Sequence, residues 1–206
     1  MVRIMILPNV KDVVSIILTM KMMILCCVIT VKSAGIMGLS QLDFEDLRGY
    51  AIMIKVLFIC HGNICRSTLA QSVFTHKVAS QGLSAHFLID SAATSTEEIG
   101  NPPHRGTVNK LRKVGIPLVP HRARQVTWAD YEKFDYIIGM DSANIRNLNR
   151  MLKGDPEGKI YKFLTFAGSD RDIADPWYTG DFDATYEDVL EGCVGFLAYL
   201  KEQGQI

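Results

Sequence analysis

The chain has 206 residues, of which 48% are hydrophobic and 21% are charged, a composition that is typical of a globular domain and argues against disorder. Lys+Arg and Asp+Glu both total 22, so no net charge points to nucleic acid as a partner. The cysteines are few and odd in number (Cys26, Cys27, Cys60, Cys65 and Cys193), which argues against a secreted disulfide framework and favours a cytoplasmic protein. They also lack the spacing of zinc ligands.

Residues 1–52 differ in composition from the rest and are interpreted as an N-terminal extension of a domain over residues 53–206. Residues 13–31 are apolar and long enough to span a bilayer, with Lys21 inside the run. Three interpretations stay open: a membrane-anchor helix with acylated Cys26 and Cys27, an additional packed helix, or a natural start at Met53. We favour the start at Met53, because a complete domain begins there.

After Met53, strand-like and helix-like segments alternate. Short apolar runs predict strands over residues 54–60, 86–91, 134–140 and 159–164. Apolar residues at helical spacing predict helices over residues 67–80, 105–114, 142–152 and from about 183 onward. Asp141 is interpreted as the N-cap of the third helix. This alternation predicts an α/β fold, an open four-stranded parallel sheet with helices on both faces.

The segment between the first strand and the first helix, CHGNICRS from Cys60 to Ser67, has the features of a phosphate-binding loop. Ligands of open α/β sheets bind at the carboxyl ends of the strands. Gly62 and Asn63 tolerate the left-handed backbone that a tight loop needs, and amides at the helix N-terminus attract anions. Arg66 supplies a planar fork that can hold two phosphate oxygens. No Gly-Lys-Ser/Thr follows Gly62, which excludes a Walker A loop.

The same surroundings would favour the thiolate form of Cys60, the form that attacks phosphorus. The Ser67 hydroxyl is placed to donate a hydrogen bond to this thiolate. A cysteine and an arginine with this spacing are a weak signal alone, because Cys60 as a buried strand residue and Arg66 as a surface charge would explain them equally well. The flanking strand and helix, and the residues that fill the loop, favour the catalytic interpretation.

This loop, together with Asp175-Pro176-Trp177-Tyr178 near the C-terminus, resembles the low-molecular-weight protein tyrosine phosphatase family. The similarity extends from about Met53 to the end of the chain. It implies that Cys60 is the nucleophile and that Arg66 binds the phosphate. Asp175 would be the acid that protonates the leaving phenolate and then the base that activates water. The resemblance implies neither a metal nor another cofactor.

The resemblance also assigns supporting roles. The loop residues expected to bind or support the phosphate are His61, Gly62, Asn63, Ile64, Cys65 and Ser67. Asn63, Ser91 and His121 would form hydrogen bonds that hold the loop rigid. Trp177 and Tyr178 would form aromatic walls of the pocket.

Two further inferences concern Ile64 and Cys65. In the family's protein-arginine phosphatase branch a threonine resembles the position of Ile64, so the isoleucine favours an aryl phosphate. The family also suggests a reversible disulfide between Cys60 and Cys65 that would protect the nucleophile from irreversible oxidation. Cys193, on an apolar helix face, is expected in the core.

The predicted function is therefore hydrolysis of phosphotyrosine in protein substrates, with membrane association only through residues 1–52. A protein-arginine phosphatase on the same fold remains an alternative. An arsenate reductase is less favoured, because no relay cysteine lies between Arg66 and Cys193. A phosphate sensor without chemistry would leave Asp175 and Ser67 idle.

Overall fold

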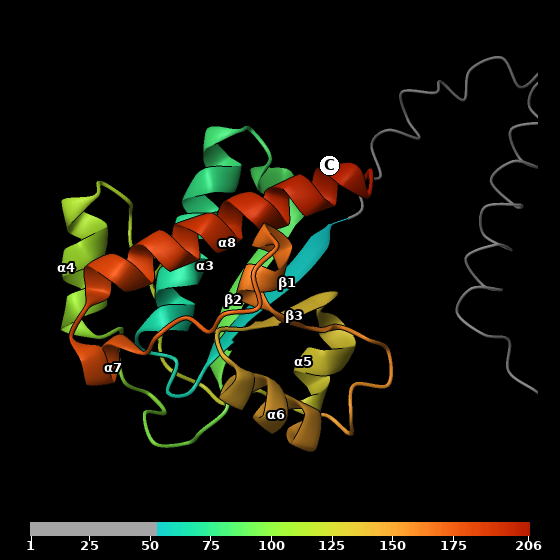
Figure 1. Ribbon diagram of the computed structural model, residues 1–206, viewed down its shortest axis with the longest axis horizontal. Coiled ribbons are helices and arrows are strands. Elements are labelled where there is room, and N and C mark those ends of the chain that lie inside the picture. Colours follow the sequence, from blue (N-terminus) through green and yellow to red (C-terminus); the bar gives the residue numbers. More distant parts are fainter. Residues whose placement is uncertain (1–52) are drawn as a thin grey trace, which may run out of the picture. The chain divides into compact units, whose positions relative to one another are not determined.

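The computed structural model describes residues 53–206, so the interpretations of residues 1–52 lie outside the described part. The sheet has four parallel strands in the order β2-β1-β3-β4 (Figure 1). Their bounds are Ile54–Cys60 for β1, Phe87–Ala93 for β2, Tyr136–Gly139 for β3 and Ile160–Lys162 for β4. The predicted open four-stranded parallel sheet is confirmed.

Strand β1 lies in the middle of the sheet and is covered on both faces. Val56 and Phe58 belong to the core beneath helices α3 (Arg66–Ser80) and α8 (Phe182–Glu202), which lie on one side of the sheet (Figure 1). Leu57 and Ile59 alternate with them and join the core beneath α5 (Trp128–Lys133) and α6 (Ser142–Met151) on the other side. This double burial explains why β1 is apolar without a break from Val56 to Cys60.

Helix α8 is the longest helix of the described part, with 21 residues. It packs beside α3 and next to α4 (Arg105–Lys113), and it buries Cys193 completely, as predicted. Its apolar residues face the sheet, whereas Val194 is exposed. Among residues 53–206, no helix combines the length and the apolarity that crossing a bilayer would require.

Several element bounds differ from the sequence prediction. The strand predicted over residues 159–164 ends at Lys162, because the chain turns into the 3-10 helix η2 (Phe163–Ala167), which buries Phe163 and Leu164. The second strand starts at Phe87, after the 3-10 helix η1 (Ser84–His86), and it extends to Ala93 because pairing with β1 continues to Cys60.

Two short helices were not predicted. Helix α5 begins with a capping box between Thr127 and Asp130, and α7 (Pro176–Thr179) begins at the N-cap Asp175 with a proline in its first turn. With 6 and 4 residues they are too short to show an apolar period.

The topology gathers four segments at one edge of the sheet. Because all strands are parallel, their carboxyl ends meet there. The loop between β1 and α3, the segment after β2 and the turn after β3 all leave from this edge. The segment before α7 reaches the same edge, since Ile173 N donates to Met140 O at 3.0 Å.

Candidate active site

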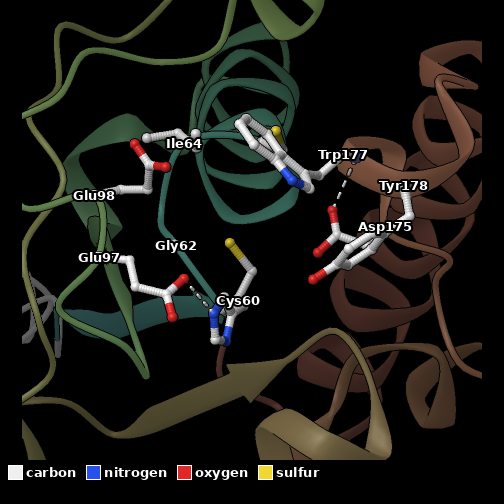
Figure 2. A pocket seen from close by; sticks show the side chains of 10 residues that line it. Cys60, Gly62, Ile64, Glu97, Glu98, Asp175, Trp177 and Tyr178 are labelled. Carbon is white, nitrogen blue, oxygen red and sulfur yellow. Dashed lines mark hydrogen bonds and ion pairs between the residues drawn. The ribbon is translucent and has the colours of Figure 1, made fainter.

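A cavity of about 90 Å³ lies over the loop that follows β1. The loop lines it with Cys60, His61, Gly62, Ile64 and Cys65. Glu97 and Glu98 form one side, and Asp175, Trp177 and Tyr178 form the other. In Figure 2 the Cys60 thiol points into the space between these two groups. The structure thus brings the predicted loop and the predicted Asp175–Tyr178 segment together around one thiol.

Cys60 is buried, with 3% of its surface exposed, and its sulfur lies among hydrogen-bond donors. The backbone N–H of Asn63 donates to Sγ at 3.3 Å. The Ser67 hydroxyl lies 3.1 Å from the same atom. Donors that point at a sulfur stabilise its charged form, so the surroundings suit a thiolate.

Two loop residues adopt their conformations for different reasons. Asn63 has a φ of 59°, in the left-handed region, as expected for the tight loop. Gly62 does not have a positive φ, so the expectation that it would supply left-handed backbone is wrong. A Cβ at Gly62 would lie 3.0 Å from Cγ of Glu98, so a glycine there lets the segment after β2 approach the loop closely.

Arg66 is 2% exposed, and its guanidinium is held from two sides. Nη1 donates to Asp141 Oδ2 at 2.5 Å and to Ile173 O at 3.0 Å. Nη2 pairs with Asp175 Oδ2. Nε is buried and has no hydrogen-bond partner among residues 53–206. A buried donor without a partner is unfavourable, so Arg66 retains a free position for an anionic ligand.

The charge of Arg66 is maintained by its neighbours. Burial by itself would lower the pKa of Arg66, but the negative charges of Cys60, Asp175 and Asp141 outweigh burial and raise this pKa above its ordinary value. The guanidinium therefore stays positive at the floor of the site.

Asp175 is fixed by its place at the start of α7. Its Oδ1 accepts from Trp177 N at 3.1 Å, which caps the helix, while Oδ2 faces Arg66. Figure 2 shows the carboxylate on the side of the cavity opposite the glutamates. The Asp-Pro pair is thus a helix start that aims a carboxylate at the site, which a plain turn would not do.

The predicted supporting residues lie together under the loop. Asn63 Nδ2 donates to Ser67 Oγ and to Ser91 Oγ, each at 2.9 Å. His121 Nε2 lies 2.6 Å from Asn63 Oδ1. Burial lowers the pKa of His121 below its ordinary value of 6.5, against the opposing effect of Asp90. The imidazole is therefore neutral at pH 7 and donates to Asn63 without adding a charge.

The two other described cysteines are free thiols, as is Cys60. Burial, followed by the negative charges of Cys60 and Asp175, raises the pKa of Cys65 to about 12. Cys65 thus lines the same cavity as Cys60 but stays protonated. The predicted Cys60–Cys65 disulfide stays a prediction.

Two residues of the site, Asp141 and Gln71, were not recognised from the sequence as functional. Asp141 caps α6, as predicted, but it also binds Arg66. Its position directly after β3, at the carboxyl edge of the sheet, is the signal that would have indicated this. Glu97 and Glu98 line the cavity, and Gln71 accepts a hydrogen bond from Ser91 at 2.7 Å. No sequence pattern distinguishes Gln71 from other helix residues.

Comparisons with known proteins agree with this geometry. The family described as low molecular weight phosphotyrosine protein phosphatase matches residues 55–206. The low molecular weight protein-tyrosine-phosphatase YfkJ of Bacillus subtilis is 41% identical over 156 residues, which is 75% of this chain and 100% of that protein. Its crystal structure superposes with a TM-score of 0.71 over 73% of this chain and 96% of the other.

Two further relatives are informative. The low molecular weight phosphotyrosine protein phosphatase of Mus musculus is 43% identical over 150 residues, 69% of this chain and 93% of its own length. The structure of DARP, described as a drosophila arginine phosphatase, superposes with a TM-score of 0.67 at 31% identity, over 72% of this chain and 98% of the other.

The fold and the loop define a phosphatase-type α/β domain with a cysteine at its anion site. The chain belongs to the low molecular weight phosphotyrosine protein phosphatase family.

Proposed function

We propose that this protein hydrolyses phosphotyrosine in protein substrates through a cysteinyl-phosphate intermediate, without a metal or another cofactor. The arrangement around Cys60 carries this proposal. A buried sulfur that accepts from the backbone N–H of Asn63 and lies 3.1 Å from the Ser67 hydroxyl is placed beside a buried arginine whose Nε has no partner among residues 53–206. Relatives that align over their whole or nearly whole length are named as protein-tyrosine phosphatases.

In the first step the Cys60 thiolate attacks phosphorus and forms an S–P bond while the bond between phosphorus and the tyrosine oxygen breaks. Asp175 gives its proton to the departing phenolate oxygen. Arg66 and the loop N–H groups hold the three remaining phosphate oxygens, where negative charge is concentrated. The products of this step are tyrosine and the cysteinyl-phosphate.

In the second step Asp175, now a carboxylate, takes a proton from water while the water oxygen attacks phosphorus. The S–P bond breaks, the thiolate is regenerated, and inorganic phosphate leaves. Ser67 would donate a hydrogen bond to the thiolate as it departs. One carboxylate therefore acts as acid in the first step and as base in the second.

The cavity walls support an aryl phosphate as substrate. Trp177 and Tyr178 offer aromatic surface beside Asp175, and the side chain of Ile64 lines the cavity close to Trp177 (Figure 2). The likeness to a protein described as an arginine phosphatase makes phosphoarginine the appropriate competing substrate. We expect phosphoproteins as partners and a cytoplasmic location, with residues 53–206 as the catalytic domain.

The test is hydrolysis of p-nitrophenyl phosphate, a phosphotyrosine peptide and a matched phosphoarginine peptide in EDTA. The full chain and a chain of residues 53–206 would be compared with Cys60→Ser and Asp175→Asn. We expect turnover that survives EDTA, is lost in Cys60→Ser and falls about 10²- to 10³-fold in Asp175→Asn. Asparagine keeps the helix cap but has no proton to transfer.

A preference for phosphoarginine would replace the proposed substrate and leave the mechanism standing. Unchanged turnover in Cys60→Ser would contradict the mechanism itself.

A further inference from the structure

The hydrogen bond between Ser67 and Cys60 has a direction that the 3.1 Å distance alone does not give. A hydroxyl can donate or accept, so Ser67 stabilises a thiolate only if its own hydrogen points at sulfur. That direction must be set by a neighbouring group that can only donate. A backbone N–H is such a group, because it cannot exchange its role.

Arg124 supplies this fixed donor. Its backbone N–H lies 3.1 Å from the side-chain oxygen of Asn63. The oxygen of the Asn63 amide therefore faces Arg124 and His121, and its NH₂ group faces Ser67 and Ser91 at 2.9 Å each. Both hydrogens of that NH₂ group are used. Asn63 is fully buried, so no solvent molecule offers an alternative partner.

The rest of the chain of hydrogen bonds follows from this orientation. Ser67 Oγ receives a hydrogen from Asn63, so its own hydrogen is available to Cys60 Sγ. Ser91 Oγ also receives one and passes its own hydrogen to Gln71 Oε1 at 2.7 Å. A flipped Asn63 amide would place NH₂ against the Arg124 N–H. Its oxygen would then take the hydrogen of Ser67 away from the sulfur.

The side chain of Arg124 holds its backbone in place. Nη2 donates to Asp90 Oδ2 at 2.8 Å, within β2, and Nη1 donates to Asp130 Oδ2 at 3.0 Å, at the start of α5. Asp130 is also the partner of Thr127 in the capping box. The guanidinium thus ties the segment before α5 to the sheet, and it keeps the N–H directed at Asn63.

We infer that Arg124 is a positioning residue that makes Ser67 a donor to the Cys60 thiolate. Its backbone N–H sets the orientation of the Asn63 amide, and its ion pairs with Asp90 and Asp130 hold that N–H in register. The inference rests on the proposed role of Cys60 as nucleophile. Arg124 itself touches neither the cavity lining nor the sulfur.

The first experiment measures the rate at which iodoacetamide alkylates Cys60 of the full chain from pH 4.5 to 8.5, with the modified cysteine identified by peptide mass spectrometry. In Arg124→Met we expect the midpoint of the rate profile to move upward by about 0.5 to 1 pH unit. The rate at pH 6 should fall about three- to tenfold. Arg124→Lys should recover part of the change. Arg122→Met, an exposed neighbour in the same segment, is the matched control and should leave the profile unchanged.

A long-range charge effect of Arg124 would also move the profile upward, so a second variant must separate the two explanations. The ionisable groups that surround Cys60 in the cavity and beneath it are His61, Cys65, Arg66, Glu97, Glu98, His121, Asp141 and Asp175. Neither Arg124→Met nor Asp90→Ala replaces any of these groups. Asp90→Ala removes a negative charge, which would lower the midpoint if charge alone acted. It also removes an anchor of Arg124, so the positioning role predicts an upward shift instead.

These measurements distinguish failure of the inference about Arg124 from failure of the proposed function. A midpoint that does not move in Arg124→Met, with a protein that is folded by circular dichroism, overturns the inference. So does a downward shift in Asp90→Ala. Turnover of p-nitrophenyl phosphate is measured in parallel. If the unmutated chain lacked turnover while the alkylation profile still moved as expected, the proposed function would fail and the positioning role of Arg124 would stand.

Discussion

The floor and the rim of the cavity are built in opposite ways. On the floor, Cys60, Asn63, Arg66 and Ser67 are at most 3% exposed, and their polar groups share partners. On the rim, Trp177 is 55% exposed and Tyr178 is 81% exposed. Groups fixed by several partners keep one geometry, whereas exposed side chains adapt. We therefore assign chemistry to the floor and substrate choice to the rim.

The rim nevertheless has some order. Glu97 Oε2 lies 2.9 Å from His61 Nε2, and Glu98 accepts from Asn101 at 2.7 Å. The ring of Trp177 rests edge-on against His104, with 5.7 Å between ring centroids. These contacts are single and solvated, so each is worth little energy. Changes on the rim should alter KM, and changes on the floor should alter kcat or stability.

The largest effect is expected from Arg66→Lys. An ammonium group cannot reproduce the planar fork that binds Asp141, Asp175 and a phosphate oxygen together. We expect kcat/KM for p-nitrophenyl phosphate to fall about 10³-fold. The matched control is Arg171→Lys, which changes a surface arginine that also binds two carboxylates, Asp188 and Glu191, and should leave kinetics unchanged. If kcat/KM of Arg66→Lys decreased by less than tenfold, the planar fork of the guanidinium would not be needed for catalysis.

Asn63→Ala should destabilise the floor. It removes four side-chain hydrogen bonds, two of them fully buried, and places alanine at a φ of 59°. We expect the free energy of unfolding in urea to drop by about 2 to 4 kcal/mol. Asn63→Gly removes the same hydrogen bonds but tolerates this φ, so it should be more stable than Asn63→Ala by about 1 kcal/mol. Equal stability of the two variants would show that the left-handed backbone carries no strain.

Trp177→Ala tests the rim. Loss of an aromatic wall should raise KM for a phosphotyrosine peptide about five- to tenfold and change kcat less than twofold. Trp128→Ala is the control, because Trp128 stacks on Tyr131 in the core beneath α5 and α6 and does not line the cavity. It should lower stability without changing KM. A fall in kcat in Trp177→Ala would mean that the rim also positions Asp175.

The smallest effect concerns pH and His121. Its pKa in the folded protein lies below 6.5, because burial disfavours the charged ring, while Asp90 opposes and Arg124 adds to this effect. The unfolded chain therefore binds the proton first as pH falls, and stability decreases below about pH 6.5 until the folded pKa is passed. His121→Gln keeps a donor for Asn63 but does not titrate. Urea unfolding at pH 7.5, 6.5 and 5.5 should show a weaker pH dependence in the variant than in the unmutated chain.

The sequence predicted the sheet well for a physical reason. The strand at Ile54–Cys60 is buried on both faces and so is apolar at every position except Lys55, and α8 buries residues at helical spacing from Val189 to Leu200. The bounds of β4 and the existence of α5 and α7 were missed, because three to six residues carry no period. Packing against α8, rather than local preference, decides where β4 ends.

For the site, the local sequence predicted the phosphate-binding loop, and the resemblance to the family predicted that Asp175 is the general acid. The sequence did not reveal that Asp141 shares Arg66, because that contact spans 75 positions along the chain. Nor did it reveal the role of Gly62, which depends on the approach of Glu98 from another segment. The hydrogen bond from the Arg124 backbone is invisible in any sequence, since every residue except proline has an N–H.

The pairing of Arg66 with Asp175 means that the protein carries its own competitor for the anion site. An incoming phosphate must displace a tethered carboxylate before it can occupy that side of the guanidinium. A ligand with one negative charge merely exchanges one anion for another, whereas a dianion gains an additional interaction. Inhibitors that present a single carboxylate should therefore be weak here, and inorganic phosphate should bind more tightly to Asp175→Asn than to the unmutated protein. Selectivity for doubly charged ligands thus follows from the ion pair between Arg66 and Asp175.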